Sequence, residues 1–260
     1  MIAPMLYTIV YAKRAEARFL SHLEVARAFE RALRRAGLPL ALSRGFNPHP
    51  YLSFALPLGV GVASRSEYLE VELAQPVSPD LLLRRLQAEM PPGLRIKQAK
   101  PSRQATPALA TLVGAAAYAA RPTWRPVPDR TSLEGAVEAL LARAEIKLGE
   151  EGKERDIRSG IWQLRPRVRR GQIALLMLLA AGSRQHVRPE AVLQALARLG
   201  GWEEERAPLI CRLGLFACLE GRLIPLGRMD APTCRRAVAT GETRSRMGSA
   251  GGGRGPRLGR

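Results

Sequence analysis

The chain has 260 residues, 46% of them hydrophobic, which is enough for one large core or two cores of ordinary size, and we expect two domains. The 41 Lys and Arg residues outnumber the 23 Asp and Glu residues and give a net charge of +18, which predicts a polyanionic partner. Nucleic acid is the first candidate. An anionic membrane surface comes second, because the sequence has no apolar run long enough to span a bilayer. Cys211, Cys218 and Cys234 form no CxxC pair, which argues against disulfide, zinc or iron–sulfur sites and indicates a reducing, cytoplasmic location.

Residues 1–100 follow the order strand, helix, strand, strand, helix, strand. A Ser-x-x-Glu capping box from Ser21 to Glu24 opens the first helix, which runs to Ala36, and Ser78-Pro79 opens the second, which ends near Met90. Alternation and apolar runs predict strands at Met5 to Ala12, Leu52 to Leu58, Glu67 to Leu73 and Leu94 to Ala99. This order is the split βαβ pattern of ferredoxin-like domains, so we expect an α+β fold.

Residues 101–107 have the composition of a linker, and residues 108–227 repeat the same order more loosely. The predicted elements are a strand at Ala115 to Ala120, a helix capped at Ser132 and running to Ala144, a hairpin of Arg155 to Val168 and Gln172 to Ala181 that turns at Arg170-Gly171, a helix from Pro189 to Leu199, and closing strand material from Leu209 to Leu226. We therefore expect two tandem ferredoxin-like halves.

Two other segments of this part have distinctive compositions. Ile173 to Ala180 contains no polar residue, which is typical of a central strand buried on both faces, although a short buried helix has the same signature. Residues 228–260 are rich in Gly and Arg and poor in apolar residues, which predicts a disordered basic tail.

The first predicted helix has an apolar side and a basic side. On a helical wheel, Ala26, Phe29, Leu33 and Ala36 share one face, and the opposite face carries Arg27, Arg31, Arg34 and Arg35. Two pairs within the helix could neutralise these charges: Glu30 with Arg34 at i,i+4, and Glu24 with Arg27 at i,i+3. The basic face therefore predicts contact with RNA phosphates, with a merely solvated face as the alternative.

The segment from Arg44 to Pro50 is the most distinctive loop of the chain. Each proline pushes the residue before it into an extended conformation, which presets Asn47 and His49. Together with Arg44 and Phe46, these side chains could stack on an unpaired base and hydrogen-bond to it. In the alternative interpretation the loop is structural, with Phe46 filling the core and Asn47 bonded to nearby backbone.

Two histidines are candidates for chemistry. His22 lies in the first turn of the first helix, where the helix dipole disfavours its protonation, and a structural role is the main interpretation. An enzymatic hypothesis stands beside it: His22 and His49 could cleave RNA by general acid–base catalysis without a metal.

A third basic cluster lies in the second half and comprises Lys153, Arg155, Arg158, Arg165, Arg167, Arg169 and Arg170. In an extended strand Arg165, Arg167 and Arg169 share one face, which could follow an RNA backbone or could protect an exposed sheet edge. Asp156, beside Arg155 and Arg158, is interpreted as an ion-pairing residue. The chain has no phosphate-binding loop, HExxH or GxSxG motif, so we expect neither a cofactor nor a metal site.

Several segments carry a family resemblance: Phe19-Leu20-Ser21-His22-Leu23-Glu24, Arg31 to Pro39, Gly45-Phe46-Asn47-Pro48-His49-Pro50 and Asp156-Ile157-Arg158. They resemble the radical-SAM-linked family, whose members occur alone or joined to a radical S-adenosylmethionine protein. The chain departs from that pattern at Arg44 and Tyr51, and it lacks the CxxxCxxC triad of radical enzymes. The resemblance implies an RNA-binding adaptor that presents ribosomal or transfer RNA to a separate radical enzyme, with ribosome association possible. In topology only, the chain is similar to the tandem ferredoxin-like endoribonucleases that process CRISPR transcripts.

Overall fold

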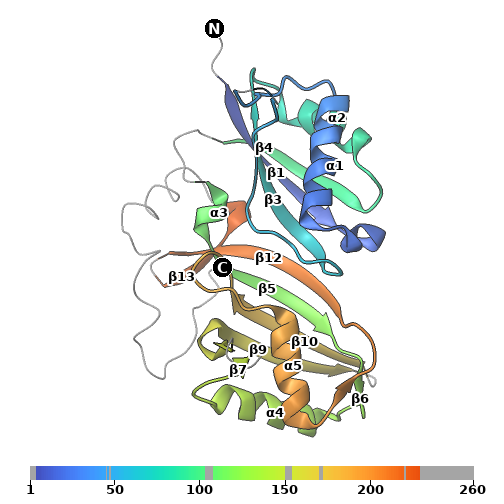
Figure 1. Cartoon of the computed structure of the whole chain (residues 1–260), viewed down its shortest axis with the longest axis vertical. Helices are drawn as coiled ribbons and strands as arrows, with labels where there is room; N and C mark the ends of the chain where they lie inside the picture. Colours follow the sequence, from blue (N-terminus) through green and yellow to red (C-terminus); the bar gives the residue numbers. More distant parts are fainter. Residues whose placement is uncertain are drawn as a thin grey trace.

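The computed structural model describes residues 4–44, 46, 48–102, 108–149, 154–169, 172–219 and 221–228. These residues form a mixed α+β structure in which one nine-stranded sheet passes through the whole molecule. Figure 1 shows one pair of long helices over the upper strands, which come from the first part of the chain, and a second pair over the lower strands. The predicted α+β class is confirmed.

The upper part of Figure 1 contains the elements of the first half, in chain order β1 (Met5–Lys13), η1 (Ala15–Phe19), α1 (His22–Arg35), β2 (Leu52–Phe54), β3 (Ala63–Leu73), α2 (Pro79–Glu89) and β4 (Leu94–Ser102). The strands pair antiparallel in the spatial order β4-β1-β3-β2. The predicted order of elements is confirmed, although β3 begins at Ala63 rather than Glu67 and β2 ends at Phe54 rather than Leu58.

Local sequence explains where the two helices of this half begin. The Ser21 hydroxyl accepts a hydrogen bond from the Glu24 amide, and the Glu24 carboxylate accepts one from the Ser21 amide at 2.7 Å, which completes the predicted capping box. Ser78 caps α2, whose first residue is Pro79. The apolar sides of both helices pack on the strands and form a core that includes Tyr7, Ile9, Phe29, Leu33, Leu69, Leu82 and Leu86.

The second half supplies the lower part of Figure 1, in chain order α3 (Leu109–Leu112), β5 (Val113–Arg121), β6 (Trp124–Arg125), α4 (Arg130–Ala142), β7 (Lys147–Leu148), β8 (Arg155–Asp156), η2 (Arg158–Gly160), β9 (Ile161–Arg169), β10 (Gln172–Ala180), α5 (Pro189–Gly200), β11 (Glu203–Glu204), β12 (Leu209–Leu219), β13 (Arg222–Pro225) and η3 (Leu226–Arg228). The main strands pair antiparallel in the order β12-β5-β10-β9. Both halves thus place their last strand beside their first, followed by their third and second.

Two details of the second half differ from the sequence predictions, and a third adds to them. Helix α4 begins at Arg130 because Asp129, not Ser132, is its N-cap: the Asp129 carboxylate accepts a hydrogen bond from the Ser132 amide at 2.7 Å. The strand predicted over Arg155 to Val168 is interrupted by η2. The closing segment turns back on itself, so that β13 pairs with β12.

Strands β3 and β12 join the two halves. They run parallel and pair at only two positions, Ala63 with Cys211 and Ser64 with Arg212. Two short sheets, β6 with β11 and β7 with β8, stand apart from the main sheet. The sheets of the two halves are therefore fused into one sheet. The sequence prediction treated each half separately and did not include this connection.

Some predictions fall wholly or partly outside the described residues. Strand β4 continues to Ser102, so residues 101 and 102 of the predicted linker are strand, and residues 103–107 are not described. The turn at Arg170-Gly171 and the tail beyond residue 228 also lie outside. Within the described part, none of the helices is both long and apolar enough to cross a membrane.

Candidate functional site

The four arginines of α1 are all exposed, but they differ in what they contact. Arg34 pairs with Glu30 at 3.0 Å, as the sequence predicted. Arg35, which has no partner within its own helix, pairs with Glu89 of α2 at 2.8 Å and also donates to the Glu89 carbonyl oxygen. The side chains of Arg27 and Arg31 make no hydrogen bond or ion pair with any described residue. These two arginines are consequently the members of the face that are open to an anion.

The helix presents these arginines because its other side is anchored in the core. Val25, Ala28, Phe29, Ala32 and Leu33 are buried, so the apolar face is centred between Phe29 and Ala32. Ala26 lies at the margin of this face, and Ala36, which the helical wheel also placed on it, is the C-cap residue that follows α1; both are half-buried. The core contacts fix the rotation of the helix about its axis and thereby the outward direction of the arginines.

The loop after α1 is closed at its base by Ser43 and His49. The Ser43 amide donates to the His49 carbonyl oxygen at 2.9 Å, and the Ser43 hydroxyl lies 2.9 Å from Nδ1 of His49 and accepts from the His49 amide. Arg34 reaches this loop through a hydrogen bond to the Pro48 carbonyl oxygen at 3.4 Å. The loop is therefore attached to the C-terminal end of the arginine face.

The aromatic side chain of this loop points into solvent. Phe46 has a relative exposure of 107%, so the alternative in which it fills the core is wrong. Arg44 and His49 are exposed as well, and Tyr51 is 47% exposed. Asn47 and Gly45 lie outside the described residues. The arrangement places a free aromatic ring and a cation on a loop that adjoins the helix cations.

The two histidines lie at different ends of α1. His22 begins the helix, and its ring packs edge-on against Phe54 with the ring centroids 5.0 Å apart. Burial, together with the charge of Lys13, lowers the pKa of His22. His49 lies on the loop attached to Arg34, and the backbone of Arg34 is about 18 Å from that of His22 at 1.5 Å rise per residue. The structure does not bring the two rings together as a catalytic pair.

In the second half, the basic stripe lies on the outermost strand of the sheet. Arg165, Arg167 and Arg169 of β9 are exposed. Leu164 of the same strand lies on the side that the helices cover, and it is buried. Among the described strands, β9 pairs with β10 alone, so it is an edge of the sheet in that part of the chain. Among the described residues these three side chains have no hydrogen bond or ion pair. The predicted arrangement of the three arginines on one face of the strand is thus confirmed, and RNA binding by them stays a prediction.

Arg158 and Asp156 have structural roles instead. The Arg158 guanidinium donates to the carbonyl oxygens of Leu141 and Arg143, where it caps the C-terminal end of α4. One Asp156 oxygen accepts hydrogen bonds from the Ile146 and Arg158 amides at 2.8 and 2.9 Å, rather than forming an ion pair as predicted. These bonds also explain why the chain leaves the strand at η2. Arg158 is therefore occupied, while Lys153 and Arg170 lie outside the described residues.

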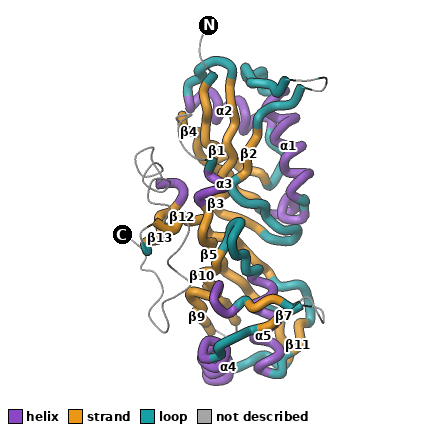
Figure 2. Tube along the Cα trace, turned by 60° about the vertical axis from the view of Figure 1, so that its left-hand side comes forward, coloured by secondary structure: helices purple, strands orange, loops and turns teal. Residues whose placement is uncertain are grey.

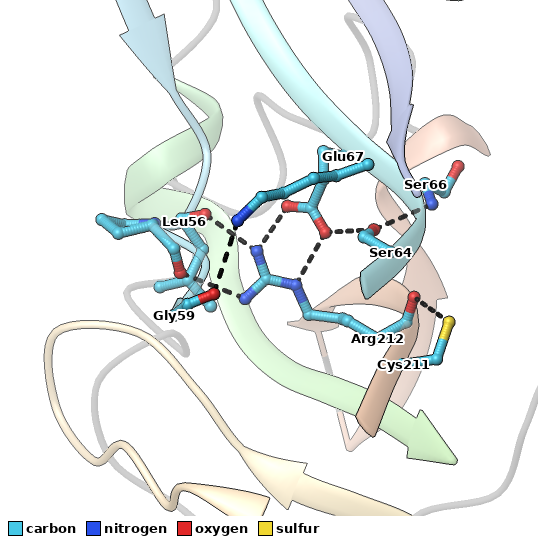
Figure 3. A network of polar contacts seen from close by, with 9 residues as sticks. Leu56, Gly59, Ser64, Ser66, Glu67, Cys211 and Arg212 are labelled. Atoms are coloured by element: carbon cyan, nitrogen blue, oxygen red, sulfur yellow. Dashed lines mark hydrogen bonds and ion pairs between the residues drawn. The ribbon is translucent and has the colours of Figure 1, made fainter. Parts of the chain in front are cut away.

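A buried polar network at the junction of the halves was not found from the sequence. Figure 3 shows Arg212 of β12 facing Glu67 of β3, and both side chains are at most 2% exposed. The Arg212 guanidinium donates to both Glu67 oxygens and to the carbonyl oxygens of Leu56 and Pro57, and the Ser64 hydroxyl donates to Glu67. Lys13 lies beside them and donates to the Leu20 carbonyl oxygen at 2.6 Å. One signal was available: Arg212 is the single charged residue in an apolar strand, and a buried charge requires a partner.

A protein-family model matches residues 7–189, which is more than half of the chain, and its description is "Uncharacterized protein conserved in bacteria (DUF2344)". The chain belongs to the DUF2344 family. The DUF2344 match contains α1, the 43–49 loop, Glu67 and the β9 stripe, whereas Arg212 lies beyond it. Among curated proteins there is no match.

Two of the solved structures that match this DUF2344 chain are distant likenesses. An unknown protein from Galdieria sulphuraria has 13% identity and a TM-score of 0.25, with 81% of this chain and 99% of that chain covered. A putative glycine cleavage system transcriptional repressor has 9% identity and a TM-score of 0.22, with 80% and 98% covered. Both scores are too low to support an inference about fold or function. Within the described residues, His, Cys, Asp and Glu form no cluster suited to a metal ion.

Proposed function

We propose that this protein binds structured RNA and acts as an adaptor. The contact surface is the arginine face of α1 together with the loop that follows it, called here the α1–loop surface and defined by Arg27, Arg31, Arg44, Phe46 and His49. The observation that carries the proposal is the full exposure of Phe46 on a loop that is attached to the arginine face. An aromatic ring without a protein partner, next to unpaired guanidinium groups, is suited to an unstacked base and its phosphates.

Charge supports RNA over a neutral partner. The chain carries +18, and Arg27 and Arg31 are exposed and form no ion pair with a described carboxylate, although the charge of Arg27 helps to lower the pKa of Glu24. Guanidinium groups match phosphate oxygens in geometry, and neutralising phosphates releases counterions, so affinity should fall steeply as salt rises. Phe46 adds a contact that salt does not screen. Unstacked bases occur in the loops of folded RNAs, which is why a structured RNA is the preferred ligand.

We also infer that the two halves are tandem ferredoxin-like units. Support comes from the strand orders β4-β1-β3-β2 and β12-β5-β10-β9, which place equivalent strands in equivalent positions and pair each neighbour antiparallel. The tandem arrangement gives the protein two separate faces on which basic residues can be displayed.

The enzyme partner is proposed from the family resemblance. Members of the radical-SAM-linked family are found joined to radical S-adenosylmethionine proteins, and this chain has basic surfaces but no CxxxCxxC triad. A radical enzyme encloses its reacting group, so an adaptor could supply the grip on a large ribosomal or transfer RNA. We propose that the two proteins meet on RNA in the cytoplasm, where the ribosome is a further candidate partner.

The RNA-binding proposal is tested with the full chain and a labelled transfer RNA or ribosomal RNA fragment. Phe46→Ala should weaken binding roughly five- to a hundredfold, the equivalent of one lost base stack. Arg31→Glu should weaken binding and lower the slope of log affinity against log salt by about one. Phe19→Ala and Arg143→Glu change an exposed aromatic and an exposed arginine elsewhere and should have little effect. Equal effects of the four variants would overturn the assignment of this surface.

The adaptor step needs a separate test. Affinity purification of the tagged chain from its native host should recover a radical S-adenosylmethionine enzyme together with RNA. Modification of that RNA should then drop when the adaptor is omitted or carries Phe46→Ala. Modification that proceeds unchanged without the adaptor would leave RNA binding in place but reject the adaptor role.

A further inference from the structure

Strands β9, β10, β5 and β12 have one face that the helices of the second half do not cover; one end of it is buried in a small cluster of Ala115, Leu178 and Leu223, and the rest is exposed. Helices α4 and α5 pack on the other face, against Leu175 and Met177 of β10 and their neighbours. The sequence predicted that the apolar strand Ile173 to Ala180 is buried on both faces, yet Leu176 is 37% exposed. An apolar side chain open to solvent in the middle of a central strand marks this face as a surface without a described partner.

Cross-strand pairing identifies the residues that share the uncovered face. Arg165 of β9 lies opposite Leu176 of β10, Leu176 lies opposite Ala119 of β5, and Ala119 lies opposite Cys211 of β12. Directly opposed residues of antiparallel strands point to the same side of the sheet. This row therefore crosses four strands, which corresponds to about 14 Å at 4.8 Å per strand. We call the surface the open sheet face, comprising Ala119, Arg121, Arg165, Arg167, Arg169, Ala174, Leu176, Leu209 and Cys211.

Cations border this face on two sides. Arg165, Arg167 and Arg169 line its outer edge on β9, and Arg121 lies opposite Leu209 at the end of β5. On the inner side, Arg65 and Arg14 of the first half lie near Cys211. Burial raises the pKa of the Cys211 thiol, and the charges of these two arginines act in the opposite direction. All six arginines are exposed, and none forms an ion pair with a described carboxylate.

The shape of the face suits an extended strand better than a folded partner. Alternate residues of β9 are about 6.6 Å apart, which is close to the separation of successive phosphates in an extended single strand of nucleic acid. Ala119 and Ala174 have only a methyl side chain, so a flat ring can approach the sheet, and Leu176 offers an apolar contact for it. Protection of an edge strand against aggregation would explain the β9 arginines alone, but not the cations on the inner side or the exposed apolar floor.

We propose that the open sheet face binds an unpaired, extended segment of RNA, with its phosphates on the β9 arginines and its bases on the floor of Ala119, Ala174 and Leu176. The inference rests on the proposed function for the class of ligand, but it uses none of the residues of the α1–loop surface. In Figure 2 the β9 edge lies at the lower left and α1 at the upper right, so the two surfaces lie on different parts of the molecule. One RNA could then be held at a folded part by α1 and at a single-stranded part by the sheet.

The test uses the full chain and a labelled oligouridylate of about twelve nucleotides, a length within the range that single-strand-binding folds occupy. Arg167→Glu should weaken its binding about tenfold and reduce the salt slope by about one. Ala119→Glu, which places a carboxylate on the floor, should weaken it by a similar factor. Arg143→Glu at the C-cap of α4 and Ala139→Glu on α4 repeat the same chemical changes at exposed positions and should alter affinity less than about twofold.

Intrinsic fluorescence gives a second measurement that does not depend on those variants. Trp124 and Trp202 are buried and stacked on each other, whereas Trp162 is half-buried and packs beside Leu178 and Ala115 on the same side of the sheet as the open face. Oligouridylate should change the emission of the protein, and Trp162→Phe should abolish that change.

The outcomes separate this inference from the proposed function. If the β9 and floor variants leave oligouridylate binding unchanged, or if heparin, a polyanion without bases, competes as strongly as oligouridylate, the open sheet face does not bind single-stranded RNA. Transfer RNA binding that still depends on Phe46 and Arg31 would in that case preserve the proposed function. The reverse result, with oligouridylate binding intact and no dependence on Phe46 or Arg31, would reject the α1–loop surface and retain the open sheet face.

Discussion

The two halves have the same strand order but display their cations on different elements. In the first half the arginines lie on helix α1, and two of the four are tied to carboxylates, Arg34 to Glu30 and Arg35 to Glu89. In the second half they lie on the edge strand β9, where none is tied to a described residue. Exposure alone therefore does not make an arginine available to a ligand. Whether an exposed arginine is available depends on whether a carboxylate lies within reach of it.

Geometry explains the contrast. A helix brings residues four apart together and can lie against a second helix, so carboxylates on α1 and α2 come within reach of its arginines. On β9 the nearest side chains are those directly opposite on β10, and these are Gln172, Ala174 and Leu176. None of the three is acidic. The stripe on the second half is thus left uncompensated by the composition of its neighbouring strand.

The largest expected effect concerns the junction that holds the halves together. Arg212→Met removes one partner of a fully buried ion pair and leaves the Glu67 carboxylate unpaired, which should cost about 3–5 kcal/mol of unfolding free energy. Urea unfolding measures the loss. The double variant Glu67→Leu with Arg212→Met should recover much of it, because both charges of the buried pair are then removed together. Glu30→Gln, which breaks an exposed pair, should cost less than about 1 kcal/mol, and a similarly small loss for Arg212→Met would show that the network does not secure the junction.

A smaller effect separates the arginines of α1 from one another. Arg31→Ala should weaken transfer RNA binding several-fold more than Arg35→Ala, because the Arg35 guanidinium is already engaged by Glu89. Glu89→Gln should strengthen binding by releasing Arg35. Filter binding at a fixed salt concentration would resolve the three variants. Equal losses for Arg31→Ala and Arg35→Ala would contradict the view that ion pairing decides which arginines bind.

The pH dependence of stability should report on His22. Its folded-state pKa is lowered, mainly by burial and further by Lys13, so the unfolded chain takes up a proton at a higher pH than the folded chain. The His22 contribution to stability is complete above its ordinary value of 6.5 and is lost as the pH falls through the lowered folded pKa. His22→Gln should remove this part of the dependence, whereas Leu23→Gln should retain it. Identical pH profiles for His22→Gln and the parent chain would contradict the prediction.

No effect at all is expected in a cleavage assay. His22 and His49 lie at opposite ends of α1, so they cannot act as the acid and base of one reaction in this arrangement. Structured RNA incubated with the chain and EDTA should remain intact on a denaturing gel. Metal-free cleavage that disappears in both His22→Ala and His49→Ala would revive the endoribonuclease hypothesis.

Short-range patterns predicted the elements well, and long-range contacts account for what they missed. Periodicity identified the arginine face of α1, the capping box at Ser21 and the shared face of Arg165, Arg167 and Arg169. It could not identify the partner of Arg35, which is 54 residues away, or that of Arg212, which is 145 residues away. Arg158 was included in the third basic cluster, because its role in capping α4 depends on contacts with Leu141 and Arg143 that the local sequence does not reveal.

The separation between Glu67 and Arg212 has a consequence during translation. Residues that far apart leave the ribosome about 7–30 s from each other at bacterial synthesis rates of 5–20 residues per second. The first half can complete its own sheet in that time, but Glu67 stays without Arg212, and Ala63 and Ser64 at the edge of β3 stay without their strand partners, until β12 emerges. An exposed strand edge next to an unpaired carboxylate is a transient weak point, and the carboxylate itself discourages pairing with another nascent chain until the correct strand arrives.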